Sequence, residues 1–206
     1  MTSLRHNSPD ELTHRGTPEP RDSYLDAARD CLLDVGWRRT TLTEVARRAG
    51  VSRMTIYRTW ADMPRLLSDL MTREWNGVVA DALADEDPET PTVERLVGDI
   101  IGTVRRLREN ELFVRIVDLD PELILPYLFS RRGRSQDAIL ELTVAALRTA
   151  QAEGVAREGN AVAMARAMLL AAHGFVLSAH TMVDDEVSAE ELDAELGRAL
   201  TRGLLP

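Results

Sequence analysis

The chain of 206 residues has 44% hydrophobic and 29% charged residues, a globular composition large enough for one good core or two small ones. Its formal net charge of −9 and pI near 5.0 exclude a uniformly basic surface, so any contact with nucleic acid must depend on a local basic region. The single cysteine, Cys31, excludes an intramolecular disulfide.

Residues 1–20 are polar, contain Pro and Gly, and have no apolar segment, which predicts a disordered tail. They fit neither a signal peptide nor a membrane span, so we expect a cytoplasmic protein. The tail has two Arg against three acids and therefore lacks the positive charge of an arm that enters a minor groove.

Residues 21–35 have apolar side chains at helical spacing, which predicts a helix that packs against the two elements after it. Cys31 lies on the apolar side of this helix, and we interpret it as a small core residue rather than a redox sensor. The apolar positions are Tyr24, Leu25, Ala28, Cys31, Leu32 and Val35.

Residues 41–60 are the one stretch whose spacing indicates a specific activity. Thr41 and Glu44 stand three apart before an apolar run, which is the spacing of a capping box and predicts a helix over residues 42–49. The inward positions of this helix are Leu42, Val45, Ala46 and Ala49.

A second short helix is expected directly after the first. Gly50 stands where the chain must turn through a left-handed conformation, and Ser52 can cap a helix that begins at Arg53. The two helices then meet across a tight turn, and the second one buries Ile56 and Trp60.

The outer face of the second helix is polar and basic. With Ile56 inward and about 100° per residue, Met54 and Arg58 point outward, with Thr55 on one flank and Arg53 and Tyr57 on the other. Such a face suits a DNA major groove, where Arg pairs with guanine and an apolar group meets the thymine methyl.

Charge supports the same interpretation. The segment 36–60 contains six Arg against one acid, a balance of +5 (6 − 1), and counterion release from DNA requires such a basic region. The alternative is a plain two-helix corner with a solvated charged face. The cap, turn, inward pattern and charge together favour DNA binding.

Residues 21–67 resemble the N-terminal DNA-binding domain of the TetR family of bacterial transcriptional regulators. The resemblance implies a three-helix domain over residues 21–66, followed by a helical ligand-binding and dimerisation domain over residues 67–206. The matching residues are Gly36 and Trp37 after the first helix, Thr41 before the second, Ala49, Gly50, Val51 and Ser52 at the turn, and Thr55, Ile56 and Tyr57 in the third.

The resemblance also implies which side chains contact DNA. Two positions depart from the family pattern, Thr59 where an aromatic residue or His is frequent, and Met63 where a phosphate-binding Lys is frequent. We expect Arg65 to supply that phosphate contact instead. The residues expected to contact DNA are Thr41, Thr43, Arg48, Ser52, Arg53, Met54, Thr55, Tyr57, Arg58 and Arg65.

The rest of the chain continues with helical periodicity. Asp62 can cap a long helix that runs to about Ala84. This helix is long enough to belong to both domains, and in a dimer its tilt would change the distance between the two DNA-contacting helices that begin at Arg53. Residues 85–92, with two Pro and no apolar residue, form the clearest linker. No segment has strand periodicity, so the fold is expected to be all-α. Further helices are expected over 92–110, 111–120, 121–131 with an interruption at Pro126, 134–154, 160–183 and 188–205.

Segment 160–183 is apolar almost all round. Arg166, His173 and His180 interrupt it, so we interpret it as a helix buried in a bundle rather than a membrane span. The resemblance implies that the last two long helices pair with those of a second subunit, and two-fold dimers commonly read palindromes. Intramolecular packing is the alternative. A seam of small residues suits close helix approach: Ala163, Ala167, Ala171, Gly174 and Ser178.

A small-molecule pocket between the helices of the second domain is also implied by the resemblance. No Gly-rich phosphate loop or Cys pair occurs, and His173 and His180 are too far apart to share one ion, so we expect no metal, no cofactor and no enzyme. The candidate pocket residues, each of which could instead be plain core, are Trp75, Phe113, Tyr127, Met164, Met168, His173 and Phe175.

Taken together, these features predict a homodimeric, ligand-responsive repressor that binds a palindromic operator in double-stranded DNA and is released by a small-molecule inducer. One alternative is a helical carrier or sensor without DNA binding, which Met63 and the acidic pI suggest. Another is a constitutive repressor or an activator of the same fold.

Overall fold

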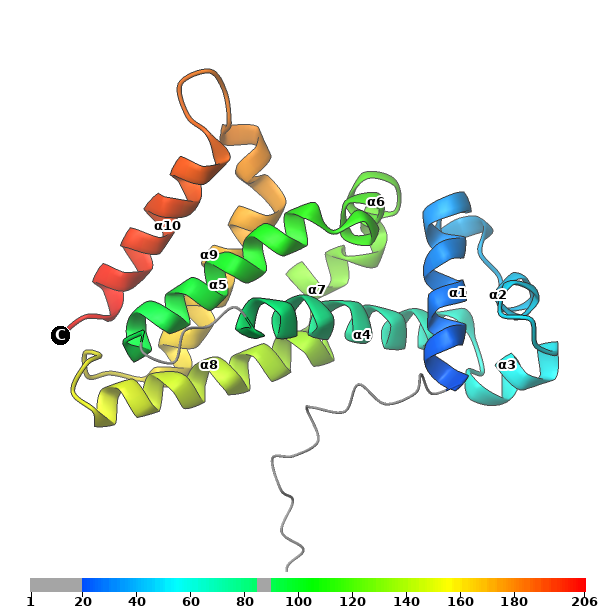
Figure 1. The fold of residues 1–206 in the computed structure, drawn as a ribbon, viewed down its shortest axis with the longest axis horizontal. Coiled ribbons are helices and arrows are strands. Elements are labelled where there is room, and N and C mark those ends of the chain that lie inside the picture. The colour runs from blue at the N-terminus through cyan, green and yellow to red at the C-terminus, as the bar shows by residue number, and fades with distance from the viewer. Residues whose placement is uncertain (1–19, 85–89) are drawn as a thin grey trace, which may run out of the picture.

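The computed structural model describes residues 20–84 and 90–206, and every regular element within these ranges is a helix (Figure 1). The all-α prediction is confirmed. The predicted tail, apart from Pro20, and most of the predicted linker lie outside the described residues. Figure 1 shows α1, α2 and α3 at one end of the molecule and the remaining helices beyond them.

The N-terminal group is a three-helix unit with its own core. Two of its helices, α2 and α3, have only seven residues each, too few to be stable alone, so they depend on apolar contacts with each other and with the longer first helix. Ile56 and Trp60 are almost completely buried in this core, as their inward positions predict. The elements are α1 (Pro20–Val35), the 3-10 turn η2 (Trp37–Arg39), α2 (Leu42–Arg48) and α3 (Arg53–Thr59).

The helix α4 (Met63–Ala84) connects the two groups. Asp62 caps it, because its Oδ1 accepts a hydrogen bond from the backbone N–H of Arg65 at 2.9 Å. The first half of α4 packs into the N-terminal core through Leu66 and Leu70. Figure 1 shows the helix running on into the second group, where it packs against α5 and α8.

The second group is a helical bundle with a separate core. Its central helix is α5, which packs against α4, α8, α9 and α10. The helix α6 is an exception in this group, since its Leu112 and Ile116 pack into the N-terminal core. The elements are α5 (Thr92–Glu109), α6 (Glu111–Leu119), η3 (Pro121–Leu123), α7 (Leu125–Phe129), α8 (Arg134–Ala152), α9 (Ala161–Ser178), η4 (Ala179–Met182) and α10 (Ala189–Leu204).

Two predicted helices have different boundaries in the structure. Pro126 lies in the first turn of α7, where its missing N–H is tolerated, so it starts a helix rather than interrupting one. The predicted helix over 160–183 is α-helical only to Ser178 and continues as the 3-10 turn η4. His173 and His180 therefore lie on different elements.

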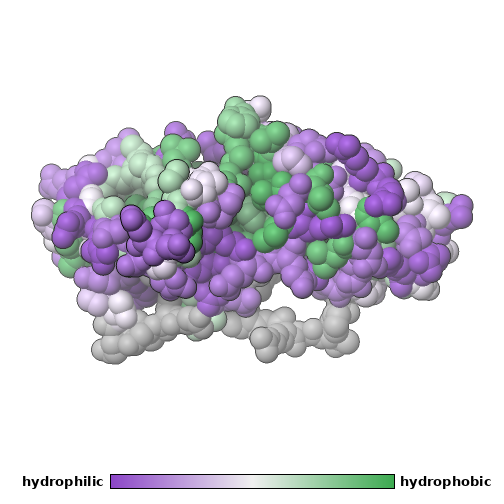
Figure 2. Space-filling view, turned by 90° about the horizontal axis from the view of Figure 1, so that it is seen from above, coloured by the Kyte–Doolittle hydropathy of each residue, from purple (hydrophilic) through white to green (hydrophobic). Residues whose placement is uncertain are grey.

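Segment Ala161–Met182 is the one helical stretch among the described residues that is long and apolar enough to cross a membrane. On one side it packs against α5 and α8, yet only 22% of its most apolar window is buried. Leu170, for example, is 70% exposed. Apolar patches also interrupt the hydrophilic surface in the view of Figure 2. A single chain thus leaves much of the apolar surface of α9 uncovered.

A buried ion pair ties α10 to α5. The side chain of Asp193 is 2% exposed, and its Oδ2 accepts hydrogen bonds from Arg105 Nε at 2.8 Å and Arg108 Nη2 at 2.6 Å. The Arg108 side chain is itself only 19% exposed. Removing the carboxylate would leave a largely buried guanidinium without its counter-charge.

We expect Asp193→Asn to lower the free energy of unfolding by about 2–3 kcal/mol, because it leaves that charge uncompensated. Urea unfolding followed by circular dichroism measures the change. Glu195→Gln is the matched control, since this exposed carboxylate on the same helix pairs with Arg198 at the surface and its loss should leave the midpoint unchanged. Equal shifts in the two variants would contradict the prediction.

Candidate nucleic-acid interface and ligand cavity

Local capping and burial fix the position of α3. The Ser52 hydroxyl accepts a hydrogen bond from the backbone N–H of Thr55 at 3.2 Å, as predicted. Gly50 has φ of +67°, the left-handed conformation predicted for the turn. Because Ile56 and Trp60 are buried on the inner side, the opposite side of α3 must face outward.

The outward face of α3 carries the predicted DNA-contacting residues. Met54 is 75% exposed and Tyr57 is 48% exposed, although both are large and partly apolar. Arg53 and Arg58 are exposed and make no ion pair with any residue that the structure describes. Two uncompensated guanidinium groups beside an exposed thioether and a phenol form a surface suited to phosphate and base contacts.

Glu44 does not complete the predicted capping box. The Thr41 hydroxyl accepts the backbone N–H of Glu44 at 3.2 Å, but the Glu44 carboxylate accepts hydrogen bonds from Arg47 at 2.9 and 2.6 Å and from Arg48 at 3.4 Å. Hydrogen bonds from Arg47 above all hold the pKa of Glu44 at about 2. Two neighbouring guanidinium groups outcompete a backbone N–H for this carboxylate.

Three other candidate DNA contacts lie outside α3 and differ in their accessibility. Arg48 is engaged by Asp34 at 2.6 Å, and its side chain is 26% exposed. Thr43 is half-buried on α2. Arg65 at the start of α4 is 74% exposed, with Asp62 4.0 Å from its Nε. Arg65 therefore has the accessibility that a phosphate contact requires.

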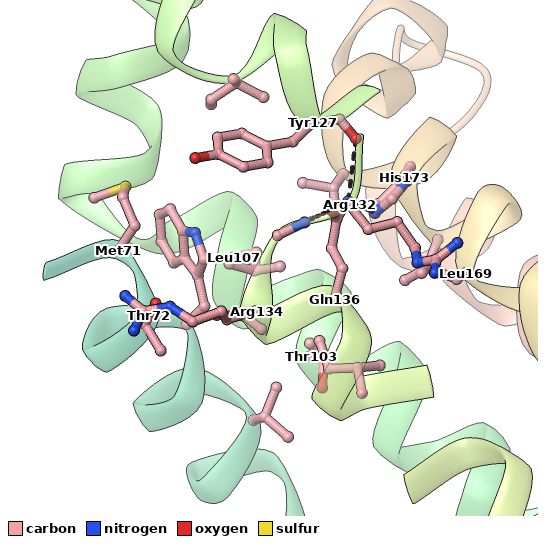
Figure 3. Close-up of a pocket in the computed structure, with 18 of the residues that line it drawn as sticks. Met71, Thr72, Thr103, Leu107, Tyr127, Arg132, Arg134, Gln136, Leu169 and His173 are labelled. Carbon is pink, nitrogen blue, oxygen red and sulfur yellow. Dashed lines mark hydrogen bonds between the residues drawn. The ribbon is translucent and has the colours of Figure 1, made fainter. Parts of the chain in front are cut away.

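A cavity of about 910 Å³ lies between the helices of the second group (Figure 3). It is walled mainly by apolar side chains of α4, α5, α8 and α9. Trp75 and Phe113 meet edge to face at 5.5 Å between ring centroids. Five of the seven candidate pocket residues line this cavity: Trp75, Phe113, Tyr127, Met168 and His173.

The structure places the other two candidates elsewhere. Met164 is buried in the core of the second group, with its sulfur 3.7 Å from Gln151 Nε2. It lies one turn before Met168 on the same face of α9, so the two residues are equivalent by periodicity but only Met168 reaches the cavity. Phe175 is half-buried and does not line the cavity.

A hydrogen-bonded polar cluster stands in the wall of the cavity (Figure 3). Gln136 Oε1 accepts the backbone N–H of Gly133 at 2.8 Å, and its Nε2 lies 3.4 Å from the carbonyl oxygen of Tyr127 and 3.1 Å from His173 Nε2. Since Gln136 Nε2 can only donate, His173 Nε2 accepts and the ring proton sits on Nδ1. Burial lowers the pKa of His173, which keeps the imidazole neutral.

The sequence interpretation missed several cavity residues, among them Gln136, Arg131 and Arg134. A signal was available, since the run of three Arg over residues 131–134 directly precedes a predicted helix. Its position beside a cavity depends on packing between distant helices, and no local pattern reports that.

The predicted seam on α9 lies largely on the surface of the single chain. Ala163, Ala167, Gly174 and Ser178 are exposed and Ala171 is half-buried. Among the described residues, no group of three or more His, Cys, Asp or Glu side chains is arranged to hold a metal ion.

The short α2, the glycine turn and the exposed basic α3 define a helix-turn-helix DNA-binding protein. The model of the family described as bacterial regulatory proteins, tetR family, matches residues 25–70. An uncharacterised HTH-type transcriptional regulator of Mycobacterium tuberculosis is 36% identical over 176 residues, which cover 85% of this chain and 89% of that protein. The regulator AlkX of the same species is 45% identical over 65 residues, 32% of this chain and 28% of AlkX.

Solved structures of similar fold agree with this assignment. A protein of unknown function from Rhodococcus sp. RHA1 has a TM-score of 0.68 at 21% identity, covering 96% of this chain and all of that one. The complex of SmeT with triclosan has a TM-score of 0.60 at 25% identity, covering 91% and 92%. The chain belongs to the TetR family and is a transcriptional regulator with a helix-turn-helix DNA-binding domain.

We expect Arg53→Ala and Arg58→Ala each to weaken DNA binding by about 1–3 kcal/mol and to relax sequence preference, as removal of a base contact does. Thr55→Ala and Tyr57→Phe should weaken binding equally for all sequences if these hydroxyls bind phosphate. Fluorescence anisotropy with selected and scrambled duplexes measures both effects. Arg198→Ala on α10 is the control, and unchanged affinity in all four α3 variants would rule out the docking of this face.

His173 should titrate below its ordinary pKa of 6.5 because burial disfavours the imidazolium. The unfolded chain therefore takes up this proton at a higher pH than the native chain does. The contribution of neutral His173 to the free energy of unfolding is intact above about pH 6.5 and is lost as the pH falls below that value. We expect the free energy of unfolding to drop more between pH 7.5 and 5.5 in the wild type than in His173→Gln. Identical pH dependence in the two proteins would contradict this.

Proposed function

We propose that this regulator is a cytoplasmic, homodimeric repressor whose dimer binds a palindromic operator and is released by a small-molecule inducer. In the ligand-free dimer, the two α3 helices would enter successive major grooves of the operator. The inducer would favour a conformer in which the two helices are wrongly spaced. It can do so only to the extent that it binds that conformer more tightly.

The observation that carries the proposal is the position of α4. This helix begins three residues after Trp60, the buried residue that ends α3, and its later turns wall the cavity through Met71, Thr72 and Trp75. A ligand in the cavity would therefore touch the same helix to which Trp60, at the end of α3, is hydrogen-bonded through Asp69. Tilting α4 is a direct route from ligand binding to DNA affinity.

The size and lining of the cavity support a ligand of drug-like dimensions. Its volume of about 910 Å³ falls at the upper end of the usual range for small-molecule sites, and its walls are mostly apolar. SmeT, which is similar to this chain, was solved in complex with triclosan. We infer a comparable role for the cavity here.

Dimerisation is supported by the uncovered side of α9. Exposed small residues along α9 allow close approach of a second helix, and Leu170 adds an exposed apolar side chain. One seven-residue recognition helix also provides little contact area, whereas two related by a two-fold axis can reach the affinity of specific sites.

Selection of genomic DNA fragments by the purified protein near physiological salt tests the repressor proposal. We expect enrichment of a palindrome, loss of enrichment in Arg58→Ala and Tyr57→Ala, and a steep fall of affinity with salt. A folded dimer that enriches nothing at low salt would favour the carrier alternative. An operator complex whose affinity no cavity ligand changes would favour a constitutive repressor or an activator.

We expect Ala167→Glu to convert the dimer to a monomer, because it places a charge where two α9 helices would meet. Analytical ultracentrifugation measures the change, and operator affinity should fall with it. Ala80→Glu places the same side chain on an exposed position of α4 and should leave the dimer intact. A dimeric Ala167→Glu protein would exclude this face as the interface.

A further inference from the structure

A single carboxylate, Asp69 on α4, connects the recognition helix with the cavity. Its Oδ2 accepts a hydrogen bond from the indole Nε1 of Trp60 at 2.7 Å and is also bonded by Arg21 of α1. Its Oδ1 accepts a hydrogen bond from Arg134 Nη2 of α8 at 2.5 Å. One oxygen thus holds the DNA-binding domain, and the other holds the ligand-binding domain.

The Asp69 cluster is well placed to transmit a change. The Asp69 side chain is only 18% exposed, so each of its hydrogen bonds forms in a partly desolvated site and is stronger than at the surface. Burial alone would raise the pKa of Asp69, but hydrogen bonds from Arg134, Trp60 and Arg21 outweigh it and lower the pKa. The carboxylate is therefore charged, and it depends on these three donors.

Arg134 is also a cavity residue. Its side chain is 60% exposed, donates to Ser68 Oγ at 3.2 Å as well as to Asp69, and extends towards α4 beside Thr72 in Figure 3. A ligand in the cavity can therefore reach the guanidinium group that bonds Asp69.

The cavity has an excess of positive charge in an acidic protein. Five Arg and three acids line it, a balance of +2 (5 − 3), whereas the whole chain has a net charge of −9. Arg132 Nε donates a hydrogen bond to Asp137 Oδ1 at 2.6 Å. The guanidinium carbon of Arg131 lies 5.1 Å from the centroid of the Tyr127 ring, and Arg131 has no carboxylate partner among the described residues. An apolar cavity with guanidinium groups at its edge suits an apolar body with one anionic group.

We propose that the cavity binds amphipathic carboxylates, and that the ligand carboxylate takes Arg134 away from Asp69. Asp69 Oδ1 then loses its tie to α8, and the hydrogen bond that its other oxygen makes with Trp60 is free to adjust. This inference rests on the proposed function, because it assigns both the chemical class of the inducer and the contact through which α3 responds.

The competition has a definite physical basis. A guanidinium group can donate two parallel hydrogen bonds to a carboxylate, and a ligand carboxylate gains this contact on top of the burial of its apolar body. A neutral ligand of the same shape gains only the burial and leaves the Arg134–Asp69 ion pair in place. The charge of the ligand, rather than occupation of the cavity alone, would therefore determine whether the Arg134–Asp69 contact breaks.

The test uses decanoate and decanamide, which have the same chain and differ in charge. Calorimetry measures binding to the full-length protein, and the indole N–H resonance of Trp60 in a ¹⁵N-labelled sample reports its hydrogen bond to Asp69. Trp37→Phe and Trp75→Phe assign the three indole signals by elimination. Arg134→Gln removes the sensing group, and Arg148→Gln is the control because this exposed Arg is on the same helix α8 but does not line the cavity.

We expect decanoate to bind about tenfold more tightly than decanamide and to shift the Trp60 resonance, whereas decanamide leaves that resonance in place. Arg134→Gln should bind both probes equally and show the shifted resonance without ligand, while Arg148→Gln behaves like the wild type. Three results with the wild type would each overturn the proposal: equal affinities for the two probes, no binding of either probe, or decanoate binding without a shift of the Trp60 resonance. These wild-type measurements are sufficient if Arg134→Gln does not fold.

Operator affinity separates this inference from the proposed function. We expect decanoate to weaken operator binding of the wild type about tenfold, within the usual range of allosteric coupling, and Arg134→Gln to bind the operator weakly with no further response. If decanamide releases the operator complex as effectively as decanoate does, the protein is an inducible repressor but the competition for Arg134 is rejected. If the protein binds no DNA, the repressor proposal is rejected, while the Trp60 resonance still tests the competition for Arg134.

Discussion

Burial of Trp60 is the interaction on which the DNA-reading surface depends. The recognition helix has seven residues, and an isolated helix of that length does not persist in water. Trp60 is 2% exposed, meets Tyr24 edge to face at 6.4 Å between ring centroids, lies under the Arg21 guanidinium at 5.6 Å, and bonds Asp69 through its indole N–H. Contacts from α1 and α4 thus define where α3 ends and which face it presents.

A second polar contact joins the two domains at the other end of α1. The backbone N–H of Trp37 donates to Asp120 Oδ2 at 2.9 Å, and this carboxylate is 5% exposed. Gly36 beside it has φ of +77°, a left-handed conformation that favours glycine. Arg38 bonds Glu122 at 3.0 Å in the same region. Together with Leu112 and Ile116 of α6, which pack into the N-terminal core, these polar contacts hold the first domain against the second at several points.

The sequence was sufficient for features that arise within one or two helical turns. The caps at Thr41 and Ser52, the left-handed Gly50 and the buried Ile56 follow from local spacing, and the structure contains them. Glu44 shows the limit of such reasoning, because Arg47 and Arg48 next to it compete for the carboxylate. Local spacing identifies a possible hydrogen-bond partner for a side chain, but it does not show which of several neighbouring donors that side chain will bind.

Contacts between distant helices could not be predicted in this way. Asp69 and Arg134 are 65 positions apart, and both read as ordinary surface charges in their own helices. Periodicity marks the inner side of α9 but does not indicate which part of that side faces a cavity, so Met164 and Met168 look equivalent. The position of the cavity is set by how far α4, α5, α8 and α9 spread apart, which depends on the packing of all four.

The charge distribution explains how an acidic protein can present a DNA-reading face. Residues 76–206 contain 13 Arg and 23 acids, so the second domain repels a phosphate backbone. The helix α3, by contrast, carries two guanidinium groups that have no carboxylate partner in the part of the chain that the structure describes. Arg47 and Arg48 of α2 are held by Glu44 and Asp34, so the available positive charge is concentrated on the recognition helix. This distribution would direct a phosphate backbone to the α3 end of the molecule. A change in the position of α3 would therefore act on the part of the surface that attracts DNA.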